Sequence, residues 1–138
     1  MALDIETDSL NTRKGQIIGI GLSNGTESVY LAHLVWDGEK LECLLSKNDL
    51  KTTLGALQVA NTKLICHNAS FDLRFIKNYL GLDLVPQLWS DSMLCKHTVD
   101  EDMPFGLKDI ATNLFGDDAT EEQKIVKASI KENGGTAN

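Results

Sequence analysis

The sequence predicts a mixed α/β fold built as a single domain over residues 1–138. Three short apolar segments near the N-terminus are separated by turns, and the segments after them alternate between helical and extended patterns. With 138 residues, 42% of them hydrophobic, the chain can bury one core but not two. Strands followed by alternating helices and strands are typical of α/β proteins.

The extended segments are expected at residues 3–8, 16–22, 28–33, 63–67 and 88–90. The second and third are joined through Asn24-Gly25, a strong signal for a hairpin, so the first three strands should form an antiparallel meander. Residues 34–45 fit either a second hairpin, turning at Asp37-Gly38, or no regular element.

Helical patterns fill most of the remaining chain. They cover residues 48–59, 70–80, a segment capped by Asp91, 107–114 and 120–131. Ser70 is the expected N-cap of the second helix and Gly81 its end. For the last helix, Thr120 and Gln123 have the spacing of a capping box.

Two acidic residues stand one residue apart in the first predicted strand. Because a strand alternates faces, Asp4 and Glu6 project from one face while Leu3 and Ile5 project from the other. Neighbouring carboxylates repel each other unless a cation lies between them, and all-oxygen ligands suit Mg²⁺ or Mn²⁺. Asp-x-Glu alone is more often a solvated edge or turn, but here it ends a buried strand beside a loop, where α/β sheets place their ligands.

Asp72 offers a third carboxylate from a different element. On the predicted helix it shares a stripe with Phe75, Ile76 and Tyr79, so it should face the sheet, where an acid needs a partner. A shared two-metal site would supply that partner. The alternative is that Asp72, in the first turn, only complements the helix dipole.

Three stretches of the chain carry a family resemblance. Asp4-Ile5-Glu6 matches a D-x-E motif, and Asn68-Ala69-Ser70-Phe71-Asp72 matches N-x-x-F/Y-D. Asp91-Ser92-Met93-Leu94, followed by Gly106-Leu107-Lys108-Asp109-Ile110-Ala111, resembles a stretch of polymerase-type members. Over roughly residues 2–116 the chain resembles the 3′–5′ exonuclease domain of DNA polymerase I-type (family A) polymerases, in the DEDD exonuclease superfamily.

This resemblance implies a ribonuclease H-like fold, in which a three-strand antiparallel meander continues into parallel strands and helices flank the mixed sheet. It also implies a two-metal-dependent proofreading exonuclease that removes nucleotides from DNA 3′ ends. Asp4, Glu6 and Asp72 would be catalytic and would hold two Mg²⁺ or Mn²⁺ ions. A single-stranded DNA 3′ end would contact Thr7, Leu10, Asn68 and Phe71.

The family's third motif, a Tyr or His followed four residues later by the last Asp, has no match. Tyr79 and Asp83 have the right spacing but fall directly after the second motif. The chain is therefore expected to be an N-terminal fragment of a longer protein, truncated at its C-terminal end, with a polymerase domain following in the same chain. Two alternatives stay open: a 3′–5′ RNA-processing exonuclease of the same superfamily, and a non-catalytic structural module of a polymerase.

The chain is acidic, with 13 basic and 20 acidic residues and a net charge of −7. Since DNA binding depends largely on phosphate neutralisation, the domain alone should bind DNA poorly and rely on metal ions and a basic neighbour. The acidity could equally serve solubility alone. Three scattered cysteines have no zinc-type or disulfide-type spacing. No membrane span or signal peptide is evident, so a cytoplasmic location is expected.

Overall fold

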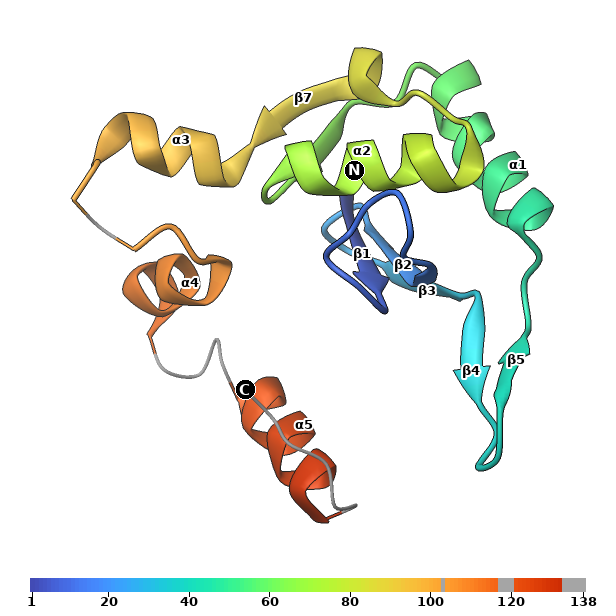
Figure 1. Cartoon of the computed structure of the whole chain (residues 1–138). Coiled ribbons are helices and arrows are strands. Elements are labelled where there is room, and N and C mark those ends of the chain that lie inside the picture. The colour runs from blue at the N-terminus through green and yellow to red at the C-terminus, as the bar shows by residue number, and fades with distance from the viewer. Residues whose placement is uncertain (103, 117–120, 133–138) are drawn as a thin grey trace. The chain divides into compact units, whose positions relative to one another are not determined.

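The computed structural model describes residues 1–102, 104–116 and 121–132. The chain divides into two compact units, Met1–Ser92 and Met93–Asn138. All described strands lie in the first unit, shown in blue to yellow in Figure 1. They are β1 (Ala2–Thr7), β2 (Ile17–Ser23), β3 (Ser28–Ala32), β4 (Leu34–Trp36), β5 (Leu41–Cys43), β6 (Leu64–Cys66) and β7 (Leu88–Asp91). The single domain expected over the whole chain stays a prediction.

Five of these strands form one mixed sheet in the order β3-β2-β1-β6-β7. The pairs β1–β2 and β2–β3 are antiparallel, whereas β1–β6 and β6–β7 are parallel. The predicted meander is confirmed, and its hairpin turns at Gly25, which has a φ of 94°. The fold class is therefore confirmed as α/β with a mixed sheet and helices, consistent with a ribonuclease H-like fold.

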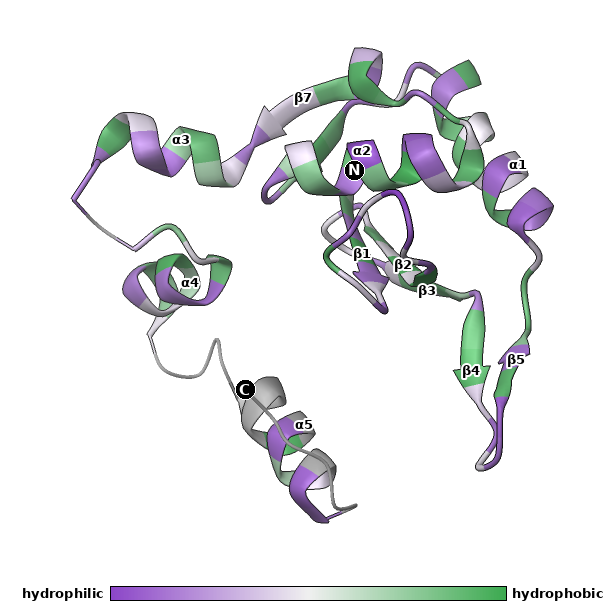
Figure 2. Cartoon of the chain, viewed as in Figure 1, coloured by the Kyte–Doolittle hydropathy of each residue, from purple (hydrophilic) through white to green (hydrophobic). Residues whose placement is uncertain are grey.

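Two helices supply most of the apolar packing against this sheet: α1 (Lys47–Val59) and α2 (Ala69–Leu80). Apolar and polar residues alternate along both ribbons (Figure 2), and the apolar ones form the core with the strands. The largest fully buried side chains are Ile17, Ile20, Leu50, Leu54, Leu64, Phe75, Ile76 and Leu84. The core of the first unit therefore lies between the sheet and these helices, and it fixes α2 in place. A short 3₁₀ turn, η1 (Val85–Gln87), leads into β7.

Residues 34–45 form the second hairpin, with β4 and β5 as a separate two-stranded sheet that turns at Gly38. His33, which is buried, ties the base of this hairpin to α2. Its Nδ1–H is hydrogen-bonded to the Leu45 carbonyl oxygen, which leaves Nε2 to accept from the Tyr79 hydroxyl at 2.8 Å. His33 therefore has a structural role.

The second unit contains only helices in its described part: α3 (Ser92–Val99, from the last residue of the first unit), α4 (Leu107–Phe115) and α5 (Glu121–Glu132). Gly116 ends α4 with a φ of 83°, as predicted. The capping box expected at Thr120 lies outside the described residues. No residue of α3 or α4 is buried. In the described part of the chain, none of the helices has the length and apolar character that a membrane span requires.

Candidate functional site

Asp4 and Glu6 occupy the outward face of β1. Leu3 and Ile5, which alternate with them, are 2% and 6% exposed and belong to the core. The antiparallel partner β2 sets glycines opposite both acids, Gly21 beside Asp4 and Gly19 beside Glu6. The sheet surface next to the two carboxylates therefore carries no side chain from β2, and the space over Gly19 is taken by the Tyr30 phenol of β3.

Asp72 lies in the first turn of α2 and is only 3% exposed. Its Oδ2 atom has no hydrogen-bond partner among the described residues. A buried carboxylate oxygen without a partner costs free energy, and a first-turn acid that serves only the helix dipole needs no such burial. Asp72 is therefore placed as a ligand-binding acid would be.

The pKa values of the three acids show that their charges interact. Burial, and then the charges of Asp4, Asp91 and Glu6, raise the pKa of Asp72 to about 7. Burial raises the pKa of Asp4, and burial together with the Asp4 charge raises that of Glu6. Repulsion of this kind falls off with distance, so these carboxylates form one cluster of negative charge.

Asp91 is the residue of this cluster that the sequence analysis missed as a site residue. Its carboxylate accepts hydrogen bonds from the backbone amides of Asn68, at 3.1 Å, and Ala69, at 2.8 Å. The expectation that Ser70 is the N-cap is wrong, because α2 begins at Ala69 and a carboxylate from β7 satisfies its first amides. The position of Asp91 at the end of a predicted strand was the signal in the sequence that indicated this role. The parallel strands β6 and β7 end together, so Asp91 lies beside the start of α2.

The donor chemistry of the cluster fits a hard divalent cation. Asp4, Glu6 and Asp72 offer only oxygen donors, and the buried Oδ2 of Asp72 has no hydrogen-bond partner in the part of the chain that the structure describes. Among the described residues, however, no three Asp, Glu, His or Cys side chains are placed so that they could hold one ion as a group. Mg²⁺ keeps several water ligands and needs only one or two carboxylates, so the residues fit a hydrated ion.

A pocket of about 520 Å³ lies between the loop that follows β1 and the first turns of α2, and none of the four acids of the cluster lines it. Three of the four residues expected to contact nucleic acid, Leu10, Asn68 and Phe71, line it together. Thr7 does not, and its hydroxyl donates to the Ser9 carbonyl oxygen instead. Leu10 is 88% exposed, so its apolar side chain is open to the pocket. The full lining is Leu10, Asn11, Thr12, Arg13, Asn68, Ser70, Phe71 and Arg74.

Tyr30 of β3 is a second residue that sequence patterns did not single out. It shares the outward face of the sheet, and a Cβ atom built on Gly19 would lie 2.1 Å from its Oη. The phenol therefore lies over Gly19, the residue opposite Glu6. Burial and the Glu6 charge raise the pKa of Tyr30, as expected for a hydroxyl close to that carboxylate.

Comparison with known protein families matches residues 1–135 to a 3′–5′ exonuclease family of DNA polymerase A. A search of curated proteins finds no match. The family match covers both acidic motifs, the pocket and nearly all of the second unit.

Proposed function

The chain belongs to the 3′–5′ exonuclease family of DNA polymerase A, and from this premise we propose that it is a two-metal-dependent exonuclease that removes nucleotides from DNA 3′ ends. The observation that carries the proposal is the buried carboxylate of Asp72, which has an unpartnered oxygen and a pKa raised to about 7 by its acidic neighbours. Repulsion between these crowded carboxylates destabilises the fold, and a cation bound among them would offset that repulsion.

Asp4, Glu6 and Asp72 are the proposed catalytic and metal-holding residues. Bound Mg²⁺ or Mn²⁺ would supply Lewis-acid activation of water and neutralise negative charge on the phosphodiester. The chain's own part is to hold these acids on a packed strand and helix, so that little reorganisation is needed during reaction. The Tyr30 hydroxyl, beside Glu6, is positioned to donate a hydrogen bond on the same face.

The substrate in this proposal is a single-stranded DNA 3′ end. Leu10 and Phe71 present apolar surfaces in the pocket, Phe71 directly before Asp72 in the chain, and stacking on an aromatic ring accepts any base. Tolerance of sequence is what an editing enzyme requires. Asn68 and Thr7 complete the proposed nucleic-acid contacts.

We further propose that the chain is part of a cytoplasmic DNA polymerase and acts in proofreading. The polymerase-like stretches at residues 91–94 and 106–111 favour DNA over an RNA-processing role. Since the sequence has no Tyr or His with a following Asp in the third-motif position, the chain alone should be weakly active. Loss of a group that positions water or metal commonly lowers rates about 10²–10⁴-fold.

Metal binding tests the site directly. Mn²⁺ should bind weakly to the wild type, and water-proton relaxation should detect much weaker binding by Asp4→Ala. Asp83→Ala is the matched control, because Asp83 pairs with Lys77 at 2.6 Å and lies just beyond the C-terminal end of α2, whereas Asp72 lies in its first turn. Equal binding by the wild type and Asp4→Ala would remove the metal site from this position.

Cleavage tests the reaction. Single-stranded DNA labelled at its 5′ end should be shortened slowly in Mn²⁺ by the wild type and Asp83→Ala but not by Asp72→Ala. An RNA strand of the same sequence, run in parallel, should be shortened more slowly. Faster shortening of RNA would favour the RNA-processing alternative. Metal binding with no cleavage of either strand by the wild type would favour the non-catalytic one.

A further inference from the structure

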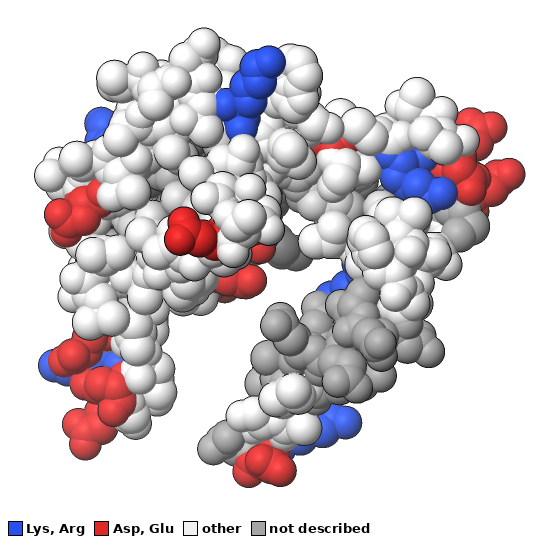
Figure 3. All heavy atoms as spheres, turned by 180° about the vertical axis from the view of Figure 1, so that it is seen from behind, with Lys and Arg blue, Asp and Glu red and all other residues white. Residues whose placement is uncertain are grey.

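Both arginines of the sequence line the same pocket. Arg13 comes from the loop after β1 and Arg74 from α2, so residues 61 positions apart are brought to one cavity of about 520 Å³. Basic residues are outnumbered on this chain, 13 against 20 acidic ones, and on the face that Figure 3 shows they stand apart from one another in small groups. Two guanidinium groups at one cavity repel each other unless an anion lies between them.

The loop that carries Arg13 is held firmly against α2. The Asn78 side-chain amide donates to the carbonyl oxygen of Thr12 at 3.1 Å and to its hydroxyl at 3.2 Å. The Asn11 side chain accepts from the Arg13 amide at 3.0 Å. A Cβ atom at Gly15 would lie 2.9 Å from the Phe75 ring, so glycine allows the loop to pack this closely. The position of Arg13 beside the helix is therefore built into the fold.

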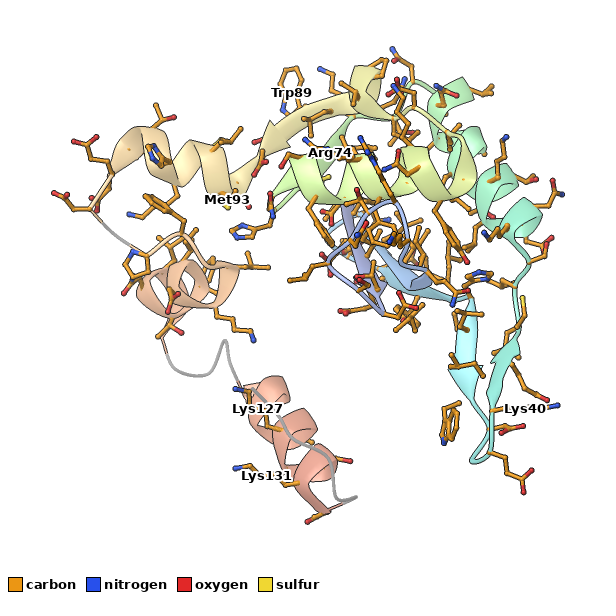
Figure 4. All side chains as sticks on the ribbon, in the orientation of Figure 1. Lys40, Arg74, Trp89, Met93, Lys127 and Lys131 are labelled. Atoms are coloured by element: carbon orange, nitrogen blue, oxygen red, sulfur yellow. The ribbon has the colours of Figure 1, made fainter. Side chains whose placement is uncertain are left out.

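Arg74 lies on the solvent-facing side of α2, four residues after Ser70, so both side chains border the pocket from one helical face. Figure 4 labels Arg74 on α2 and, at a separate place, Lys40 on the β4–β5 hairpin. Lys40, Lys77 and Lys96 each pair with a carboxylate. Neither guanidinium has a hydrogen-bond or ion-pair partner among the side chains that the structure describes.

The lining of the pocket suits a phosphodiester. Guanidinium groups match phosphate oxygens with paired donors, and the Ser70 hydroxyl adds another donor at the same wall. Leu10 and Phe71 offer apolar surface for an adjoining base. Resting on the proposed exonuclease function, we propose that Arg13 and Arg74 bind a backbone phosphate of the substrate strand that is not itself cleaved, and so hold the 3′ end beside Asp72.

The experiment measures binding without cleavage. A labelled oligothymidylate is titrated with the 138-residue chain in EDTA at several salt concentrations, and fluorescence anisotropy is recorded. Arg13→Gln and Arg74→Gln should each weaken binding about 5–10-fold. The double variant that carries both changes should lower the slope of log K against log salt by about 0.7, the value for one phosphate of a single strand. Lys40→Gln, which changes the net charge equally, should bind as the wild type does.

A second arm replaces one linkage at a time by uncharged methylphosphonate. One replacement near the 3′ end should weaken wild-type binding but leave the binding of the double variant unchanged. The proposal is overturned if Lys40→Gln weakens binding as much as the arginine variants do, or if the wild type does not bind at low salt. Arginine-dependent binding without cleavage in Mn²⁺ would instead refute the exonuclease function and leave the phosphate site standing.

Discussion

The two units of the chain differ in how their apolar residues are used. In Met1–Ser92, leucine, isoleucine and phenylalanine side chains from the sheet, α1 and α2 are fully buried. In Met93–Asn138, the helices α3 and α4 bury no residue, and their large apolar side chains face solvent. The exposed ones are Leu94, Val99, Leu107, Leu114 and Phe115.

This difference in burial separates the unit that holds the candidate site residues from the unit that does not. Asp4, Glu6, Asp72 and Asp91 all stand on strands or helices of the unit that has a core, so packing fixes their positions. The helices of the second unit have regular backbone structure, but helices in proteins draw most of their stability from packing an apolar face. That unit should therefore tolerate substitution far better than the first until a partner surface covers it.

The largest expected effect compares the same substitution in the two units. Phe75 is 0% exposed and Phe115 is 77% exposed. Phe75→Ala should lower the free energy of unfolding by about 3–5 kcal/mol, because it removes buried surface and leaves a cavity. Phe115→Ala should change it by about 0.5 kcal/mol or less. Urea unfolding followed by circular dichroism measures both. Comparable losses would show that Phe115 is buried in solution and that the contrast between the units is wrong.

The next effect is the pH dependence that the carboxylate cluster imposes on the first unit. The pKa of Asp72 is about 7 in the folded chain and 3.8 ordinarily. Between these two pH values the folded state therefore binds a proton that the unfolded state has lost. The free energy of unfolding should therefore fall as pH rises from 4 to 7, by at most about 4 kcal/mol. The raised pKa values of Asp4 and Glu6 act in the same direction. Denaturant unfolding in EDTA at several pH values measures the fall.

Asp72→Asn is the matched variant for this prediction, because it keeps the shape and removes the charge. Its free energy of unfolding should fall less across the same window, because only Asp4 and Glu6 still contribute, and should exceed that of the wild type at pH 8. Mn²⁺ should stabilise the wild type at pH 8 and have less effect on the variant. Asp37, Asp49 and Asp83 have lowered pKa values and act in the opposite direction, but only below pH 4. A wild type whose stability rises from pH 4 to 7 would contradict the crowding.

Sequence patterns predicted the strands and helices of the first unit well because their signals are local. Alternation set Asp4 and Glu6 on one face, and the helical stripe set Asp72 beside Phe75 and Ile76 in the core. What patterns could not supply were contacts between elements distant in sequence. The cap of α2 comes from Asp91, 22 residues after Ala69, and Arg74 and Arg13 line one pocket only because the loop folds back on α2.

A smaller effect concerns helix capping in the two units. Asp91→Ala removes the acceptor of two backbone amides and should lower the free energy of unfolding by about 2 kcal/mol. In α4, the cap residue Gly106 makes no side-chain hydrogen bond, and Asp109 stands in the first turn. Asp109→Ala should therefore cost only about 0.5 kcal/mol, through the helix dipole. Hydrogen exchange should quicken at the Asn68 and Ala69 amides in Asp91→Ala; unchanged exchange there would exclude the cap.

The smallest effect tests how closely the outward face of the sheet is packed inside the first unit. A methyl group at Gly19 would meet the Tyr30 hydroxyl, whereas one at Gly21 would have only the Asp4 carbonyl oxygen, at 3.9 Å, within contact. Because the tip of a tyrosine ring can turn aside, Gly19→Ala should cost only about 1 kcal/mol or less. It should nevertheless move the phenol away from Glu6, so that the pKa of Tyr30 falls toward the usual value of about 10. Gly21→Ala should leave that pKa unchanged. Nuclear magnetic resonance titration of the tyrosine rings measures the pKa of Tyr30 separately from that of Tyr79. Equal changes in the pKa of Tyr30 in the two variants would mean that Tyr30 does not need the space above Gly19 to approach Glu6.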